Sequence, residues 1–93
     1  MTLDFEWDPE KDRSNQSKHG VSFAEAVSAF GDPLARTVPD PRTFEGEYRL
    51  VTTGYTSGRK LIVVWHTERG ERVRIIGARE ATPRERRTYD SES

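Results

Sequence analysis

Three runs rich in β-branched and aromatic residues set the strongest limit on how this chain folds. They cover residues 48–55, 60–67 and 72–79. Ser57-Gly58 and Arg69-Gly70 separate the runs, which is the spacing of strands joined by hairpins. The middle run is apolar on both faces over residues 61–65, and periodicity alone also permits a short buried helix there. Its β-branched content and flanking glycines favour a central strand, so we expect a largely antiparallel sheet.

Two further extended segments are predicted in the first half of the chain. Leu3, Phe5 and Trp7 alternate with acidic residues, as in a short strand with one apolar face. Residues 34–38 follow Pro33, which cannot continue a helix, and they predict a second short strand. The chain therefore offers up to five strands to one sheet.

An ordinary core helix is predicted between these two segments. Ser22 and Glu25 have the spacing of a capping box, and Val21 and Ala26 are placed for a hydrophobic staple. The helix carries a narrow apolar stripe at helical spacing, formed by Phe23, Ala26, Val27 and Phe30.

A third helix is predicted at the C-terminus, where Thr82 and Glu85 repeat the capping-box spacing and Pro83 suits the first helical position. The resulting order of elements is typical of an α+β fold, with a small antiparallel sheet, two N-terminal helices and a short C-terminal helix. We expect the helices on one face of the sheet and the other face free for a ligand. With 93 residues and a 32% hydrophobic share, residues 1–93 are expected to form one domain.

Residues 9–20 show every sign of a helix but contain no core-forming side chain. Asp8 is a suitable N-cap, Pro9 suits the first turn, and Gly20 suits a left-handed terminator. One side of this helix carries two cations, an amide and an imidazole, namely Lys11, Asn15, Lys18 and His19. A short helix usually keeps its place by burying an apolar stripe. A polyanion is a natural partner for this polar side, and a solvated connector whose His19 complements the helix C-terminus is the alternative.

Composition narrows the classes of protein to which the chain can belong. It has no cysteine, so disulfides and thiolate metal sites are excluded, and two histidines make a structural zinc site a poor expectation. No cofactor is predicted. The N-terminus does not resemble a secretory signal, and no apolar run approaches the ~18 residues of a membrane span. We expect a soluble cytoplasmic protein without a membrane partner.

The charges are unevenly distributed along the chain, although the net charge is only −1. Residues 1–47 hold five Lys and Arg against ten Asp and Glu, whereas residues 59–87 hold nine against four. Such asymmetry indicates a binding face for phosphates or acidic partners, with an acidic surface elsewhere.

Several arginines are candidate site residues, each with an ordinary alternative. Arg74 and Arg79 are predicted to face opposite sides of the third run, so one of them lies among apolar neighbours and must pair with a carboxylate or line a site. Arg59 follows Gly58 at a predicted hairpin tip, where an exposed turn residue is the simpler interpretation. The carboxylates available for ion pairing are Glu6, Glu47 and Glu80. For Trp65 and His66, core packing and an edge hydrogen bond are the default expectations.

Metal-independent RNA cleavage needs few chemical groups. A base removes a proton from the 2′-hydroxyl, cations stabilise the phosphorane, and an acid protonates the leaving 5′-oxygen. Lysine, histidine and arginine can fill these roles where the fold brings them together, and the chain contains all three.

Taken together, these segments resemble the BrnT family of bacterial type II toxins. The blocks that carry the resemblance are residues 5–8, 18–23, 58–59, 67–70 and 74–79, with Lys11, Asn15, Glu47, Arg49 and Tyr89 between and after them. The Lys-His-Gly-Val-Ser-Phe block at residues 18–23 is fairly specific. The family usually has serine where this chain has Gly77.

The resemblance implies a RelE-like fold and an endoribonuclease that inhibits translation by cutting RNA. It implies a cognate BrnA-type antitoxin, contact with operator DNA only through that antitoxin, and a toxin dimer within a heterotetramer. The residues it marks as catalytic are Lys18, His19, Arg59 and Arg79, with His19 or Lys18 as the base and an arginine as the phosphorane stabiliser. The residues it marks as substrate-binding are Lys11, Asn15, Arg49 and Arg74. A catalytically degenerate member that only binds antitoxin or represses the operon, and a nucleic-acid-binding module unrelated to toxicity, are the alternatives.

Overall fold

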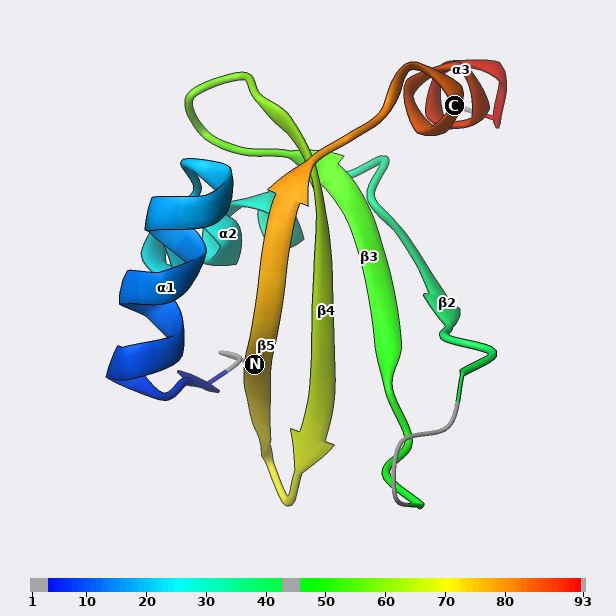
Figure 1. The fold of residues 1–93 in the computed structure, drawn as a ribbon. Coiled ribbons are helices and arrows are strands. Elements are labelled where there is room, and N and C mark those ends of the chain that lie inside the picture. The colour runs from blue at the N-terminus through cyan, green and yellow to red at the C-terminus, as the bar shows by residue number, and fades with distance from the viewer. Residues whose placement is uncertain (1–3, 43–45, 93) are drawn as a thin grey trace.

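The computed structural model describes residues 4–42 and 46–92 and has an α+β fold, as the sequence predicts (Figure 1). Five strands form one sheet in the order β1-β5-β4-β3-β2. Their bounds are β1 Asp4–Glu6, β2 Arg36–Pro39, β3 Leu50–Tyr55, β4 Leu61–Arg69 and β5 Arg72–Glu80. The hairpin pairs β3–β4 and β4–β5 are antiparallel and β4 is central, so both predictions for the second half are confirmed.

One strand pair is parallel, which the antiparallel prediction did not include. β1 pairs with β5 in the same direction, with Phe5 opposite Val73 and Glu6 opposite Arg74. No hairpin joins these two strands, because two helices and three strands lie between them in the chain. Local turn signals therefore could not set their relative direction.

The helices begin and end close to the residues predicted for them. They are α1 Pro9–His19, α2 Phe23–Ser28, which continues into the 3₁₀ turn Ala29–Gly31, and α3 Pro83–Glu92. The Asp8 side chain accepts a hydrogen bond from the Glu10 backbone N–H at 2.9 Å, and Gly20 ends α1 in the left-handed region at φ 69°. Ser22 caps α2 through a 2.9 Å bond from the Glu25 backbone N–H.

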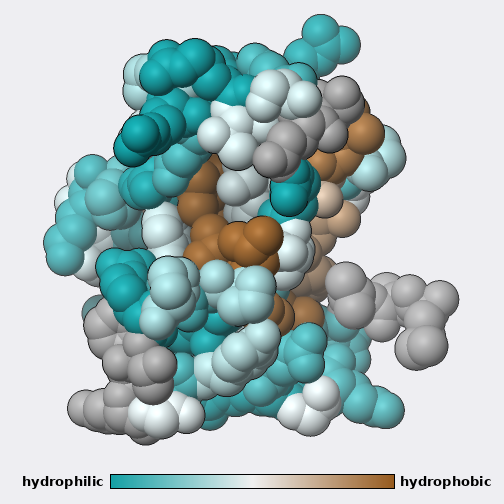
Figure 2. Space-filling view, turned by 90° about the vertical axis from the view of Figure 1, so that its right-hand side faces the viewer, coloured by the Kyte–Doolittle hydropathy of each residue, from teal (hydrophilic) through white to brown (hydrophobic). Residues whose placement is uncertain are grey.

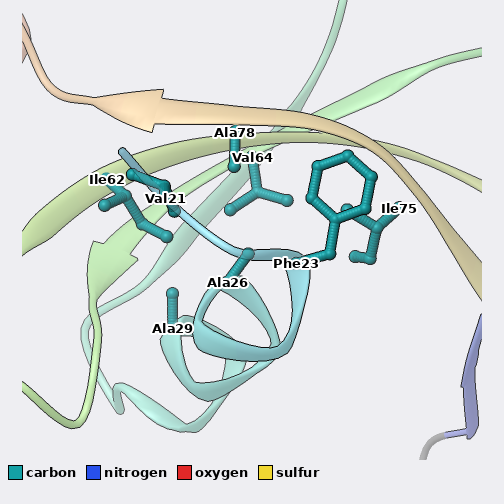
Figure 3. Close-up of a cluster of buried hydrophobic side chains, with 8 residues drawn as sticks. All are labelled: Val21, Phe23, Ala26, Ala29, Ile62, Val64, Ile75 and Ala78. Atoms are coloured by element: carbon teal, nitrogen blue, oxygen red, sulfur yellow. The ribbon is translucent and has the colours of Figure 1, made fainter. Parts of the chain in front are cut away.

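The hydrophobic core lies between α2 and the face of the sheet that this helix covers (Figure 3). Phe23 and Ala26 of α2 are fully buried and point toward Ile62, Val64 and Ile75 of the two central strands. Burying an aromatic or aliphatic side chain of this size contributes about 1.5–3 kcal/mol each. The apolar stripe predicted for this helix is therefore its docking face.

A buried amide, rather than an apolar stripe, holds the polar helix α1 against the edge of β5. The Asn15 side chain donates to the Val21 and Ala78 carbonyl oxygens, both at 2.8 Å, and accepts from the Ala78 backbone N–H at 3.1 Å. β1 pairs with β5 only as far as Arg74. Beyond that residue, the Asn15 side chain makes hydrogen bonds to the β5 backbone in place of a neighbouring strand. Asn15 is 9% exposed. A single side chain thus satisfies three backbone groups and fixes α1 beside the sheet.

A β-bulge changes the alternation of side chains along β5. The register shifts between Trp65 and His66, which leaves Ile76 as one extra residue on β5. Because a bulge offsets the alternation by one residue, Arg74 and Arg79 lie on the same face of the sheet as Trp65. The prediction that these two arginines face opposite sides was therefore wrong.

The C-terminal helix α3 packs on the other face of the sheet from α2, which corrects the prediction that all helices share one face. The Tyr89 hydroxyl donates to Asp32 Oδ2 at 2.6 Å, and the Tyr55 backbone N–H donates to the same oxygen at 2.8 Å. Burial, followed by the contact with Asp32, raises the pKa of Tyr89 to about 12. The Tyr55 and Tyr89 rings meet edge to face with centroids 5.4 Å apart. α3 therefore covers one end of the open face and leaves the rest accessible.

Apolar surface gathers over the β2 side of the molecule (Figure 2). Leu34 and Val38 are 52% and 45% exposed there. A groove of about 270 Å³ runs between β2, β3 and α3, with Val38, Thr53 and Tyr89 among its lining residues. Within residues 4–42 and 46–92, no helix has both the length and the hydropathy to cross a membrane.

His66 is expected to make the fold acid-sensitive. The residue is 4% exposed, and its Nε2 shares a 2.7 Å hydrogen bond with Thr52 Oγ1. The centroids of the His66 and Phe30 rings lie 5.0 Å apart. Burial lowers the pKa of His66 from 6.5 to about 4. As pH falls, His66 is therefore protonated in the unfolded chain before it is protonated in the folded chain. The contribution of His66 to the unfolding free energy is fully present above pH ~6.5 and is lost as pH drops toward 4. We expect a loss of about 3 kcal/mol across this window in denaturant titrations.

The matched control is His66→Gln, which keeps a polar group near Thr52 but cannot titrate. Its unfolding free energy should stay nearly constant from pH ~6.5 to ~5, above the range in which the carboxylates with lowered pKa titrate, namely Glu6, Asp32, Asp40 and Glu85. An equal loss in wild type and in this variant would contradict the assignment of the acid sensitivity to His66.

Candidate nucleic-acid interface

An open cleft of about 620 Å³ lies on the face of the sheet that α2 does not cover. The C-terminal end of α1, the bulged part of β5, the centre of β4 and the start of β3 surround it. Its lining residues are Asn15, His19, Arg42, Arg49, Trp65, Ile76, Gly77, Ala78 and Arg79. All ionisable side chains among these described residues are basic, which is the composition expected of a site for polyanions.

A smaller hollow of about 210 Å³ adjoins this cleft along α1 and is lined by Lys11, Ser14, Asn15, Lys18, His19 and Ile76. The two hollows share Asn15, His19 and Ile76. We treat them as one surface, the cationic cleft, whose basic residues are Lys11, Lys18, His19, Arg42, Arg49 and Arg79. Six basic side chains converge on it, and none of the carboxylates in residues 4–42 and 46–92 is among its lining residues. The cationic side of α1 predicted from the sequence is thus part of a larger site.

Three of these six side chains point from α1 without an internal partner. Lys11, Lys18 and His19 are exposed, and among residues 4–42 and 46–92 their side chains make no hydrogen bond or ion pair. The other side of α1 differs, since Arg13 pairs with Glu10. An unpaired lysine or histidine keeps its full capacity to bind an incoming phosphate or to exchange a proton.

The arginines on the sheet side of the cleft are each oriented by a carboxylate. Arg49 Nε lies 3.3 Å from Glu47 Oε1, as the sequence allowed for Glu47. Arg42 lies 3.2 Å from both carboxylate oxygens of Asp40, and these contacts hold the pKa of Asp40 below its usual value. A paired guanidinium keeps donors that point elsewhere, because each arginine has five N–H groups.

Arg79 is the most firmly held cation of the cleft. Its two terminal nitrogens bond to the two carboxylate oxygens of Glu85 at 2.7 and 2.9 Å, and its guanidinium carbon lies 5.1 Å from the centre of the Trp65 ring. The hydrogen bonds that Arg79 donates to Glu85 raise the pKa of Arg79 and lower the pKa of Glu85. Glu85 also closes the capping box predicted with Thr82, through bonds of 2.8 and 3.2 Å. The start of α3 thereby fixes the orientation of Arg79.

Two arginines marked by the sequence do not line the cleft. Arg74 bonds to Glu6 at 2.7 Å, and Arg72 lies 3.6 Å from the same carboxylate, so the ion pair with Glu6 considered from the sequence is present. Contacts with Arg74 lower the pKa of Glu6. Arg59 is exposed in the turn between β3 and β4. The structure therefore groups Lys11, Lys18, His19, Arg49 and Arg79 around Asn15, and leaves Arg59 and Arg74 outside.

One substitution at Arg59 tests the backbone conformation of the turn between β3 and β4, apart from any chemical role of the side chain. It adopts φ 65°, a left-handed conformation that glycine accepts more readily than arginine, and its backbone N–H closes a turn onto the Thr56 carbonyl at 2.9 Å. We expect Arg59→Gly to leave the unfolding free energy unchanged or raise it by up to about 1 kcal/mol. Equilibrium denaturation checks this, and a marked loss of stability would contradict it.

Sequence reasoning missed six of the described residues that line the cleft, namely Ser14, Arg42, Trp65, Ile76, Gly77 and Ala78. Trp65 was interpreted as core, because it ends the most apolar strand. Ile76 reaches the cleft through the bulge, and the sequence gives no local signal for that feature. In the described parts of the chain, no three His, Asp or Glu side chains converge as a metal site would require.

Comparison with known proteins gives results that agree with this geometry. A family model described as the ribonuclease toxin BrnT of type II toxin-antitoxin systems matches residues 7–85. The crystal structure of the Brucella abortus ribonuclease toxin BrnT superposes with a TM-score of 0.63 at 25% sequence identity. The likeness covers 87% of this chain and 99% of that one. No curated protein matches the chain in sequence.

Proposed function

Since the chain belongs to the BrnT family and is a ribonuclease toxin of a type II toxin-antitoxin system, we propose that it binds and cuts RNA in the cationic cleft. The observation that carries this proposal is the convergence of six basic side chains on one open surface, where the described lining residues include no carboxylate. A phosphodiester backbone is the polyanion that such a surface attracts, and binding there should weaken steeply with salt. Residues 1–93 act as one toxin domain in this proposal.

The proposed chemistry is attack of a ribose 2′-oxygen on the adjacent phosphorus. His19 takes the 2′-hydroxyl proton, with Lys18 as the alternative base, and a second protonated group supplies the proton that the departing 5′-oxygen needs. Arg79 is the candidate for stabilising negative charge on the phosphorane. The P–O5′ bond breaks as the P–O2′ bond forms, which leaves a 2′,3′-cyclic phosphate and a 5′-hydroxyl.

The other candidate residues divide into binding and positioning roles. Lys11 and Arg49 line the cleft on opposite sides and bind the phosphates that flank the cut. Asn15 acts by holding α1, since its amide is already bonded to three backbone groups. Arg74 acts by holding β1 through Glu6. Arg59 is the remaining catalytic candidate, and it would contribute from outside the cleft.

Cleavage of an end-labelled RNA by the purified toxin in excess EDTA tests this mechanism. The proposal predicts cutting that does not depend on added divalent cations, products with 2′,3′-cyclic phosphate ends, and no cutting of an all-2′-O-methyl RNA of the same sequence. Cutting of the methylated RNA, or 5′-phosphate ends, would contradict the role given to the 2′-hydroxyl. A folded wild-type protein that neither cuts RNA nor arrests growth on expression would instead support the catalytically degenerate alternative.

A type II toxin has an antitoxin partner. The resemblance to the BrnT family also implies which kind of antitoxin this partner is. We propose a BrnA-type antitoxin with a DNA-binding segment, so that operator DNA is contacted only through the antitoxin. We further propose a heterotetramer with a toxin dimer, acting in the cytoplasm. Light scattering of the co-purified complex, with and without operator DNA, tests the stoichiometry and the DNA requirement. DNA binding by the toxin alone at physiological salt would contradict this assignment.

A further inference from the structure

The cationic cleft has an apolar floor, formed by Trp65, Ile76 and Gly77, which phosphate binding does not explain. Trp65 on β4 pairs directly with Gly77 on β5, so no side chain stands opposite the indole across the strand pair. Trp65, Ile76 and Gly77 together form an uncharged area surrounded by His19, Arg49 and other basic residues. A phosphate needs hydrogen-bond donors, and this area presents one polar side-chain atom at most, the indole nitrogen.

We propose that this floor is a nucleobase subsite, where a base of the bound RNA stacks on the Trp65–Arg79 pair. The inference rests on the proposed RNA-binding role of the cleft and adds to it a site for the base. The Arg79 guanidinium lies 5.1 Å from the indole centre, and its bidentate bond to Glu85 fixes its plane. Bases stack on aromatic rings and on guanidinium planes, and single-strand binding sites combine such platforms with a basic groove.

Three features of the chain prepare this site. Arg79 lies two residues after Gly77, the partner of Trp65, so regular alternation along β5 puts Arg79 on the same face as the indole. Glycine at position 77 leaves the space beside the indole open, since a Cβ there would meet only Asn15 Oδ1, at 3.8 Å. Trp65 is only partly buried, although it lies on the central strand of the sheet.

Fluorescence of Trp65 tests the proposal directly. The chain has two tryptophans, so Trp7→Phe leaves Trp65 as the single emitter. The probe is an all-2′-O-methyl oligonucleotide, which lacks the attacking hydroxyl, and its partner is a fully abasic oligonucleotide of the same length and charge. Stacking predicts strong quenching by the first probe and little by the second. Equal quenching by both probes, or none by either, would overturn the proposal.

Substitutions then measure the contribution of the base. Trp65→Leu should weaken binding of the base-bearing probe by about 5- to 150-fold, the equivalent of ~1–3 kcal/mol per stacked base, and leave abasic binding within twofold. Trp65→Phe should recover most of the loss. Gly77→Val, which keeps the indole, should also weaken only base-bearing binding. Equal loss of both probes in all three variants, at unchanged melting temperature, would contradict base recognition.

The experiment also separates this inference from the proposed function. Base-dependent quenching without any RNA cleavage would support the nucleobase subsite and contradict the catalytic proposal. Normal cleavage with an unchanged KM in Trp65→Leu would support the catalytic proposal and contradict the nucleobase subsite.

Discussion

Replacing His19 by alanine is expected to slow RNA cleavage by about 10²–10⁴-fold, the usual contribution of a general acid or base. His19 ends α1, is exposed, and lines both hollows of the cationic cleft. Its side chain makes no hydrogen bond within the described residues, so removing it should cost little stability. Single-turnover cleavage rates at saturating toxin, measured against pH, give the result. A proton-transfer role also predicts loss of one limb of the pH–rate profile.

Matched variants on the same helix make this test specific. Gln16→Ala alters another exposed α1 side chain that lines neither hollow, and its rate should stay within twofold of wild type. Lys18→Ala and Arg13→Ala remove the same charge on different sides of α1, and only the first should reduce the salt dependence of RNA binding. If His19→Ala cuts RNA at the wild-type rate while Lys18→Ala does not, the base is Lys18.

Replacing Asn15 by alanine is expected to cost about 4 kcal/mol of unfolding free energy, a large part of the stability of a small domain. The substitution removes the partners of three backbone groups, namely the Val21 carbonyl and both the N–H and the carbonyl of Ala78. Each orphaned buried group costs roughly 1–3 kcal/mol, and water at the strand edge recovers part of the total. Urea denaturation followed by circular dichroism measures the loss.

Asn15→Asp tests the same hydrogen bonds with almost no change of volume. The carboxylate can accept from the Ala78 N–H but cannot donate to the two carbonyl oxygens, so its proton is held more tightly in the folded state than in the unfolded state. A raised folded-state pKa means that the variant should gain stability as pH falls toward the ordinary range of aspartate. Asn15→Ser leaves no group that reaches all three partners and should show no such gain. Wild-type stability in Asn15→Ala would contradict the role assigned to this amide.

Local signals predicted most of the fold. The caps at Asp8, Ser22 and Thr82 and the hairpins around β4 depend on residues close together in the chain, and the structure has them. The parallel β1–β5 pair, the bulge and the position of α3 depend on residues far apart in the chain. Periodicity does not encode such contacts. The predictions that Arg74 and Arg79 face opposite sides of the sheet, and that α3 packs on the same face as the other helices, were therefore wrong.

The candidate site was predictable only where it follows one helix. Helical spacing placed Lys11, Asn15, Lys18 and His19 on one side of α1, and the structure keeps them together. It could not show that Asn15 is buried by backbone contacts with β5, because those partners lie 63 residues away. The contributions of Trp65 and Arg42 likewise arise from the sheet and from a loop, where no local pattern marks them.

The central claim is that RNA occupies the cationic cleft between α1 and the open face of β4 and β5. Amide and indole chemical shifts of ¹⁵N-labelled toxin, titrated with an all-2′-O-methyl oligonucleotide, test it most directly. The account predicts the largest shifts at residues 15–19 and 76–79 and at the Trp65 indole N–H, with small shifts in α3. Shifts confined to α3, where Arg84, Arg86 and Arg87 are also exposed, would contradict it.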